Sequence, residues 1–426
     1  LSVPVIIEMF GEGLFAIFDM FFVSKVSVNA ISTVALTETT MFIIFSVAIG
    51  ISMATSAIVS RRIGEKDEER AGHATRQAIY IAIASGAFLG GIGVVFAPEI
   101  LRLMGAEQGV IDEGLGYTRL MYGSNIIVML LFIINGAFRG AGNSAIAMWV
   151  LLLANLLNII LDPILIFGLG PIPAFGVQGA AIATTTGRSV AVIVQLIILF
   201  KGRSRLKPFL KSLALDLNTA SEIMILSLGG MAQFLIESAS WLFLMAFIGR
   251  EGNAQVAGFG IGFRIIAFTL LPSWGLAQAA AALVGQNLGA LKPDRAETSV
   301  LRSALYNMIF LLFVSVGFYM ISDFIIAVFF TTEPDVAYFA ALTLKVVCLG
   351  YIFFAVGMVV SQAFNGAGDT LTPTLINVIC FWLIQIPLAL LLTRVYDMGL
   401  LGVLICISVC HSIHAIISYA IFRRGK

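Results

Sequence analysis

Long apolar runs recur from one end of the chain to the other, and they constrain its fold more than any other feature. Examples are residues 79–96, 126–137 and 307–321. Many of these runs approach the roughly 20 residues that a helix needs to cross the hydrocarbon layer of a bilayer. Only 12% of the 426 residues are charged, whereas a soluble domain carries roughly 25%. The sequence therefore predicts an all-α, polytopic membrane protein rather than a soluble enzyme with one anchor.

Charged residues, glycines and prolines divide the chain into about twelve apolar spans. The spans are expected at residues 3–25, 30–59, 71–97, 114–137, 144–168, 175–200, 221–249, 253–284, 297–329, 338–363, 371–394 and 398–422. They form an N-terminal six-helix lobe at 1–200 and a C-terminal six-helix lobe at 221–426, joined by a basic cytoplasmic linker at 201–220. The chain starts at Leu1 inside an apolar run, so we expect a short stretch to precede it.

Lysine and arginine gather in the loops that follow even-numbered spans. Examples are residues 61–70, 201–211 and the last residues, 423–426. Because short cytoplasmic loops carry an excess of these residues, we expect these loops and both termini to be cytoplasmic, in a plasma (inner) membrane. No basic block indicates nucleic-acid binding. The four cysteines lie in apolar segments without metal-ligand spacing, which favours reduced packing residues.

The two halves of the chain repeat one another. "GEKDEERA" (64–71) resembles "GALKPDRA" (289–296), and "FRGAGNS" (138–144) resembles "FNGAGDT" (364–370). The copies keep the same order at a separation of about 225 residues. Copies with six spans each start on the same side of the membrane, an arrangement found in alternating-access transporters. In the "GAGN" and "GAGD" turns we expect glycine at positive φ, and Asn143 or Asp369 capping the next helix.

Several acids lie inside spans that are otherwise apolar. The first span holds Glu8, Glu12 and Asp19, whose spacing places them on one helical face. In "NIILDPILIF" (158–167), Asn158 precedes Asp162 by one helical turn and Pro163 follows at once. A charge in mid-bilayer costs a few kcal/mol or more, so such acids normally face a cavity or a partner.

These residues form a candidate cation site. Carboxylates, an amide oxygen, a hydroxyl and a carbonyl freed by Pro163 suit a hard monovalent cation or a proton relay. The sequence predicts a site of Asp19, Asn158, Asp162 and a threonine from "IATTTGRS" (182–189). In the alternative interpretation, the Asn–Asp pair only holds helices together and the threonines bond to their own helix.

Other polar residues of the spans are secondary candidates for cation or substrate binding. Glu12 could lie near the membrane surface. Glu237, in the seventh span, could instead be satisfied locally by Gln233 or Ser238. Arg188 and Arg264 are expected to be ion-paired or snorkelling structural residues.

Five segments carry a resemblance to a known family. "DMFFVSKVSVNAISTVAL", "NIILDPILIF", "GVQGAAIAT", "VGQNLGA" and "FNGAGDTLTP" are similar, in order and spacing over nearly the whole chain, to segments of the multidrug and toxic compound extrusion (MATE) family. The first-span acid with a fifth-span N-x-x-x-D most resembles the DinF-like branch. The resemblance implies a V-shaped pair of six-helix lobes that exports amphipathic, usually cationic compounds against Na⁺ or H⁺.

The resemblance also assigns residues. It implies cation binding, with Na⁺ as one candidate ion, by Asp19, Asn158, Asp162 and Thr184, with Thr185 open as the alternative threonine. Glu237 resembles a seventh-span glutamate of the NorM-like branch. That branch also has an acid in its tenth span, where "GYIFFAVGMVVSQAFNG" has none.

The expected function is therefore antiport of small-molecule drugs by a monomeric, non-enzymatic membrane protein with no cofactor besides its coupling ion. One alternative is a flippase for lipid-linked precursors, which would need a strongly basic cavity to bind pyrophosphate. The other is an intramembrane aspartyl protease, since "GAGD" (366–369) fits a G-x-G-D pattern. The Y-D pair at 396–397 follows that pattern, the reverse of the protease order.

Overall fold

The computed structural model describes residues 2–201, 205–206, 214–329 and 333–425, and helices make up nearly all of them. The part described contains no β-strand, only one isolated bridge between Leu169 and Ile172 in a loop. The all-α prediction is confirmed. Most of the predicted linker, residues 202–204 and 207–213, lies outside the described residues.

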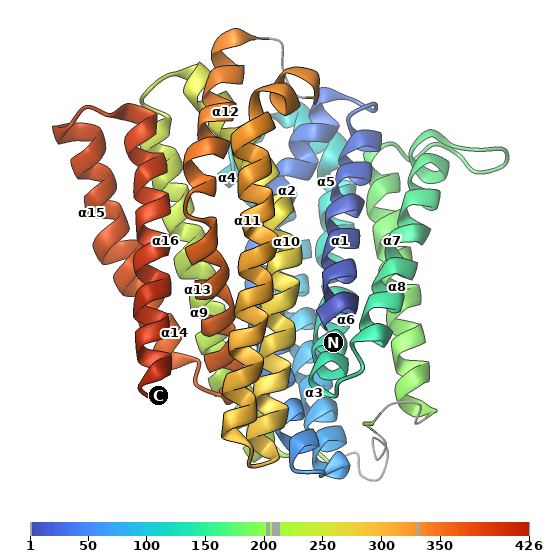
Figure 1. Ribbon diagram of the computed structural model, residues 1–426. Coiled ribbons are helices and arrows are strands. Elements are labelled where there is room, and N and C mark those ends of the chain that lie inside the picture. The colour runs from blue at the N-terminus through green and yellow to red at the C-terminus, as the bar shows by residue number, and fades with distance from the viewer. Residues whose placement is uncertain (1, 202–204, 207–213, 330–332, 426) are drawn as a thin grey trace. The chain divides into compact units, whose positions relative to one another are not determined.

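The chain divides into two compact units. The first takes in Val3–Met231 and Gly289–Leu291, and the second takes in Ala232–Leu288 and Lys292–Lys426. The helices before this division are α1 (Ser2–Val23), α2 (Val28–Gly64), α3 (Glu68–Val95), α4 (Ala97–Leu103), α5 (Gln108–Gly123), α6 (Asn125–Gly140), α7 (Ser144–Phe167), α8 (Val177–Phe200) and the start of α9 (Leu217–Ile248) (Figure 1).

The second unit contains the rest of α9 and all later helices. Its α12 and α13 are separated by a short break, and its penultimate span is interrupted by two π-helical stretches, η1 and η2. The elements are α10 (Asn253–Gly289), α11 (Pro293–Phe329), α12 (Pro334–Cys348), α13 (Tyr351–Ala367), α14 (Leu371–Asn377), η1 (Val378–Ile384), α15 (Gln385–Leu390), η2 (Leu391–Val395) and α16 (Gly399–Arg423).

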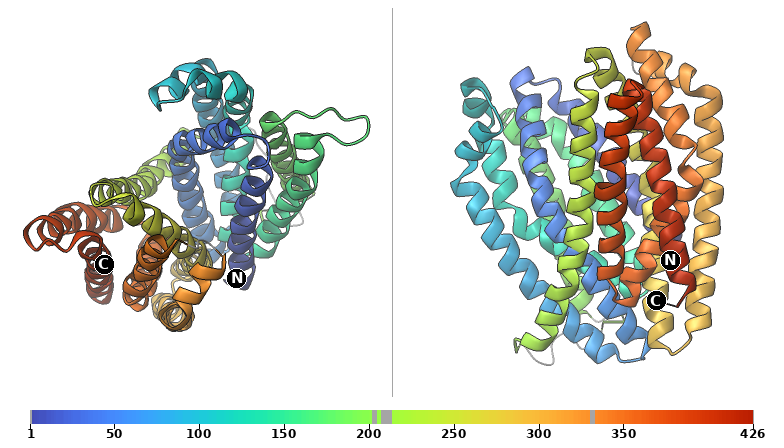
Figure 2. Two further views of the ribbon diagram at one scale, coloured as in Figure 1. Left: turned by 90° about the horizontal axis from the view of Figure 1, so that it is seen from above. Right: turned by 90° about the vertical axis from the view of Figure 1, so that its left-hand side faces the viewer.

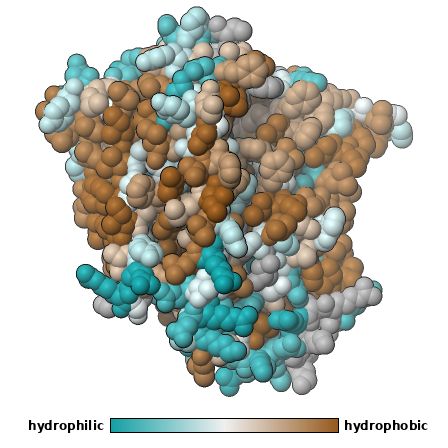
Figure 3. All heavy atoms as spheres, in the orientation of Figure 1, coloured by the Kyte–Doolittle hydropathy of each residue, from teal (hydrophilic) through white to brown (hydrophobic). Residues whose placement is uncertain are grey.

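Length and apolarity identify the membrane spans. Nine helices of the described chain are long and apolar enough to cross a bilayer, and the bent pairs α5–α6 (42°) and α12–α13 (58°) raise the number to eleven. The helix α1 is the remaining predicted span, and its three acids keep it outside this apolar set. With α1 included, the twelve predicted spans are all present as helices. On the face shown in Figure 3, apolar residues cover the middle of the helices and hydrophilic residues gather toward their lower ends.

The turn between α6 and α7 and its repeat between α13 and α14 share one backbone feature. Gly142 and Gly368 adopt φ of 81° and 87°, a region that favours glycine, as predicted. The two capping predictions differ in outcome. The Asp369 carboxylate accepts from the Thr372 backbone N–H at 3.0 Å, whereas the Asn143 side chain makes no capping bond to α7. The Asn143 prediction was wrong because residue type alone does not set its side-chain rotamer.

Candidate cation-binding site

Close packing of α7 against α8 builds the first unit's candidate site. The two helices lie side by side in Figure 1 and in the view from above in Figure 2. Gly179, Ala183 and Gly187 recur one turn apart on α8 and are buried. A Cβ added at Gly187 would lie 2.6 Å from the Ala154 carbonyl oxygen. Small residues at this spacing let two backbones approach closely, which brings short polar side chains within bonding distance.

Asn158 bridges the two helices at this point. Its Nδ2 donates to Thr184 Oγ1 on α8 at 2.9 Å and lies 3.3 Å from Asp162 Oδ1 on its own helix. All three side chains are buried, and Asp162 is 0% exposed. The structure therefore brings three of the four sequence-predicted residues together. Among the threonine candidates, Thr184 is the one that makes this contact.

Asp19 contributes the fourth polar group from α1. It is buried, and it lies close enough to Asp162 for the two carboxylate charges to repel one another. Tyr117 on α5 is also near both acids. Two acids that face each other in a buried site are unfavourable together unless a cation or proton neutralises one of them.

The site has unfilled bonding capacity on oxygen. Within the described residues, Asp19 Oδ1, Asn158 Oδ1 and Asp162 Oδ2 are buried and have no hydrogen-bond partner. Pro163 lies inside α7 and has no N–H, so it cannot donate to the carbonyl of Ile159 one turn earlier. Buried polar atoms without partners are rare and indicate a ligand, an ion or a proton. An oxygen-only donor set suits a hard cation such as Na⁺, or a proton.

The other acids of α1 are paired with arginines. Glu8 Oε1 accepts from Arg139 Nη1 on α6 at 2.7 Å, and Asn135 Nδ2 lies 3.3 Å from the same oxygen. Glu12 contacts Arg188 on α8 more loosely, at 3.7 Å. This ion pair agrees with the structural role expected for Arg188. The predicted common face of α1 thus holds two ion pairs and one acid of the cation site.

The secondary candidates Thr185 and Glu237 have different surroundings. Thr185 is adjacent to Thr184, but its buried hydroxyl has no partner among the described residues. Glu237 belongs to the second unit. Gln233, one proposed local partner for Glu237, instead exchanges two 3.0 Å hydrogen bonds with Asn365. The structure gives no support for Gln233 satisfying Glu237.

Sequence reasoning missed two polar residues beside the site. Asn155 lies on the Asn158 face of α7, and its Nδ2 is buried without a partner in the part of the chain described. Its three-residue spacing from Asn158 was the available signal. Tyr117 gave no such signal, because it comes from α5 and its position depends on tertiary packing.

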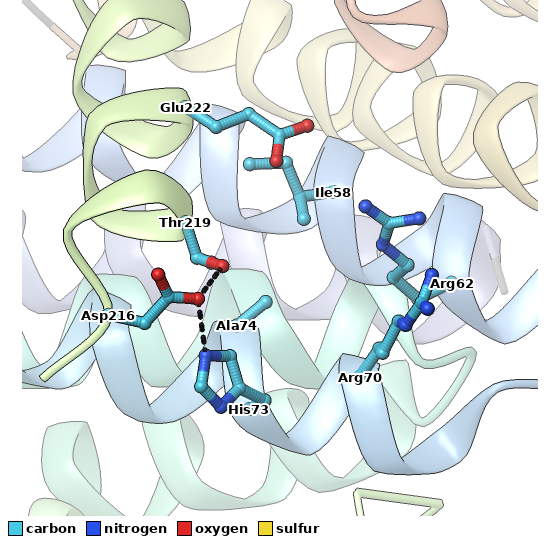
Figure 4. A pocket seen from close by; sticks show the side chains of 8 residues that line it. All are labelled: Ile58, Arg62, Arg70, His73, Ala74, Asp216, Thr219 and Glu222. Atoms are coloured by element: carbon cyan, nitrogen blue, oxygen red, sulfur yellow. Dashed lines mark hydrogen bonds and ion pairs between the residues drawn. The ribbon is translucent and has the colours of Figure 1, made fainter. Parts of the chain in front are cut away.

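A separate polar cavity of about 340 Å³ lies in the first unit where α2, α3 and the start of α9 meet (Figure 4). There, Asp216 accepts from Thr219 Oγ1 at 2.6 Å and contacts His73 Nε2 at 3.0 Å. These two hydrogen bonds, that from Thr219 first, lower the Asp216 pKa from 3.8 to about 2. The cavity thus marks where the end of the predicted linker attaches to α3. It is lined by Ile58, Arg62, Arg70, His73, Ala74, Asp216, Thr219 and Glu222.

Comparisons with known proteins agree with this architecture. A family model described as MatE matches residues 4–164 and again residues 231–391, once in each half of the chain. The chain is 25% identical over 400 residues to the probable multidrug resistance protein YoeA of Bacillus subtilis, covering 93% of this chain and 86% of that protein. It is 26% identical over 431 residues to a FAD transporter of Shewanella oneidensis, covering 100% and 93%.

A solved structure shares the fold. The crystal structure of MATE in complex with MaL6 superimposes with a TM-score of 0.94 at 24% identity, covering 100% of this chain and 94% of that one. The family model thus matches the chain twice, once in each of the halves that the repeated motifs relate.

Proposed function

Because the chain belongs to the multidrug and toxic compound extrusion (MatE) family of membrane transporters, we propose that it exports amphipathic, cationic small molecules in exchange for Na⁺ or H⁺. The observation that carries this proposal is the buried group of Asp19, Asn158 and Asp162, whose oxygens lack partners among the described residues. Two buried carboxylates destabilise the protein when both are ionised and no cation is bound between them. Binding of a cation to such a pair is therefore strongly favoured.

The proposed cycle uses competition for these charges. A cation entering from outside neutralises Asp19 or Asp162, and this removes the counter-charge that holds a cationic substrate. The substrate then leaves, and the protein returns to its inward-open state. Exchange requires only that the coupling cation and the substrate favour different conformations of the protein, or that they compete for the same carboxylate. Each elementary charge that moves inward down 100 mV contributes about 2.3 kcal/mol to export.

The charge balance in the first unit supports a cationic substrate. Arg139 and Arg188, the two arginines described beside α1, already contact its acids. Asp19 and Asp162 are additional acids. A flippase would need arginines available for pyrophosphate, so this balance favours cation export.

Efflux from proteoliposomes tests the proposal. Purified protein is reconstituted with a fluorescent cationic dye, and a Na⁺ gradient or a pH gradient is imposed in turn. We expect one gradient to drive efflux. Asp19→Asn and Asp162→Asn should each lower that efflux at least about 100-fold, the scale of losing a neutralisable charge worth about 3 kcal/mol.

Asp323→Asn is the matched control, since Asp323 forms an ion pair with Lys345 and is more than half exposed. This variant should retain wild-type efflux. Wild-type efflux in both site variants, with all proteins equally well inserted, would contradict the assignment of Asp19 and Asp162. Efflux without either gradient would contradict antiport itself. The same preparations report oligomeric state, for which we expect a monomer.

A further inference from the structure

The polar cavity where α2, α3 and the start of α9 meet is divided by charge. Arg62 and Arg70 lie together on one side of it, whereas Asp216 and Glu222 lie on the other side, where the chain enters α9 (Figure 4). All four residues belong to the first unit. The cavity volume of about 340 Å³ is within the range of small-molecule sites. The cavity therefore presents a positive side and a negative side to one small ligand.

Hydrogen bonds hold part of the negative side in place. The buried Arg76 donates from Nη2 to His73 Nδ1 at 2.7 Å, so His73 carries its hydrogen on Nε2 and donates it to Asp216 at 3.0 Å. Asp216 also accepts from the Thr219 hydroxyl and from the Asn218 backbone N–H. Three hydrogen bonds thus occupy the Asp216 carboxylate, which positions the start of α9.

Glu222 supplies the available negative charge of the cavity. It follows Thr219 by three residues, so both side chains lie on neighbouring positions of one face of α9. Glu222 is exposed, and its carboxylate makes no hydrogen bond or ion pair with any described residue. A positively charged ligand group in the cavity would therefore contact Glu222.

The two arginines keep N–H donors for an anion. Arg62 contacts Glu65 through Nη1 at 3.0 Å, and Arg70 contacts Asp67 through Nε at 3.3 Å. Each contact uses one nitrogen, whereas a guanidinium carries five N–H donors on three nitrogens. The other donors of both side chains remain for a phosphate, whose oxygens match the planar guanidinium.

We propose that this cavity binds the phosphoethanolamine headgroup of a membrane lipid, with its phosphate at Arg62 and Arg70 and its ammonium group at Glu222. A ligand with only an anionic group would leave Glu222 uncompensated, and one with only a cationic group would face the arginines. A zwitterion matches both sides. A primary ammonium group donates three hydrogen bonds, as in Lys, whereas the quaternary ammonium of choline donates none. Ethanolamine should therefore be preferred to choline.

Exposed apolar residues beside the cavity favour a lipid as the source of this headgroup. Leu215 and Leu217, on either side of Asp216, are 62% and 71% exposed. Ile225, one turn further into the span than Glu222, is 64% exposed. The cavity lies at the ends of the apolar helices α2, α3 and α9, which is the level of the lipid headgroups. Acyl chains can thus cover Ile225 while the headgroup occupies the cavity.

Calorimetric titration of the full chain in detergent tests the proposal. The probes are dihexanoyl phosphatidylethanolamine, phosphatidylcholine and phosphatidylglycerol, which differ only in the headgroup, and the heat of mixing with detergent alone is subtracted. We expect phosphatidylethanolamine to bind at least about tenfold more tightly than the other two lipids, because only its headgroup adds a charged hydrogen bond to Glu222.

Variants of the cavity identify the contacts. Glu222→Gln keeps the shape of an exposed side chain and should bind phosphatidylethanolamine and phosphatidylcholine about equally. Arg62→Gln should weaken binding of phosphatidylethanolamine about tenfold. Arg61→Gln is the matched control, because Arg61 also contacts Glu65 but does not line the cavity; this variant should bind like the wild type. Thermal unfolding without lipid shows that each variant is folded.

Equal binding of the three lipids by the wild-type chain, or an unchanged preference in Glu222→Gln, would overturn the proposal. Glycerophosphoethanolamine carries the same headgroup without acyl chains and should bind much more weakly than the lipid. Equal affinity would assign the cavity to a soluble ligand and overturn the lipid source. The site is independent of the proposed export, since Asp19→Asn should abolish efflux and leave lipid binding unchanged.

Discussion

At the scale of single residues, the acids of α1 differ in how completely they are paired. Glu8 is 1% exposed and bonds to Arg139 at 2.7 Å. The Glu12 side chain is 31% exposed and stays 3.7 Å from Arg188. Each of these acids has one oxygen without a hydrogen-bond partner among the described residues, but Glu8 and Glu12 form ion pairs and none is described for Asp19. Acids on one helix thus hold helices together at one position and remain available for a cation at another.

The Glu8–Arg139 pair predicts a non-additive loss of stability. Glu8→Gln or Arg139→Gln alone leaves an uncompensated buried charge, so each should lower the free energy of unfolding by about 3 kcal/mol. The double variant has no such charge and should recover a large part of this loss. Thermal unfolding in detergent measures all three. Glu12→Gln is the control and should cost less, and additive losses in the double variant would contradict direct pairing.

The sequence identified the polar residues of the site but not all of their contacts. Asn158 and Asp162 could be placed together because one helical turn separates them, and Thr184 only through family resemblance. The pairing of Glu8 with Arg139 joins residues 131 positions apart. Such pairings depend on how each helix is rotated about its axis, and that rotation is set by packing rather than by local sequence.

At the scale of elements, the contact between α7 and α8 depends on glycine. Gly187→Ala places a methyl group against the Ala154 carbonyl. The helices must separate, which should stretch the Asn158–Thr184 bond and lower stability by about 1–3 kcal/mol. Calorimetry and efflux should both show the loss. Gly91→Ala on α3 is the control, because nothing lies within 4 Å of its added Cβ; an equal loss there would exclude the packing explanation.

The start of α9 should respond to pH through Asp216. Its ionised carboxylate accepts from the Asn218 backbone N–H at 3.0 Å as well as from Thr219. Because the folded-state pKa is lowered to about 2, this stabilisation is present above about pH 4 and is lost as the pH falls through 2.

Amide hydrogen exchange in the first turn of α9 measures the effect. Asp216→Ala should accelerate exchange at neutral pH, whereas wild-type protein should lose protection there only on strong acidification, after correction for intrinsic rates. Glu222→Ala, in the same cavity, should leave exchange near the wild-type rate. Unchanged protection in Asp216→Ala would show that packing alone holds this turn.

Element boundaries were predictable where glycine or charge marks them. The turns at Gly142 and Gly368 follow from the repeated motif. The break at Ser124 between α5 and α6 was not predicted, although Gly123, Ser124 and Asn125 interrupt the apolar run there. The π-helical stretches were also missed.

At the scale of the whole molecule, the repeat and the basic loops predict one orientation in the membrane. Lys66 lies in the loop between α2 and α3, and Gly170 lies in the loop between α7 and α8. In a background without the four native cysteines, Lys66→Cys should react with an impermeant thiol reagent only from the cytoplasmic side. Gly170→Cys should react only from outside. The reverse pattern would overturn the predicted cytoplasmic termini.

The acidity of α1 has a consequence for biosynthesis. The three carboxyl groups of α1 weaken its tendency to pass from the translocon into the lipid. The arginine that pairs with Glu8 is synthesised 131 residues later. At roughly 5–20 residues per second, the ribosome needs about 7 to 26 s to deliver Arg139. During that interval the newly synthesised α1 carries an unpaired acid and is poorly stabilised in the lipid. It then depends on chaperones or is exposed to membrane proteases. Mutations that delay the synthesis or insertion of α6 should therefore reduce the amount of protein in the membrane while the transport activity of each inserted molecule stays unchanged.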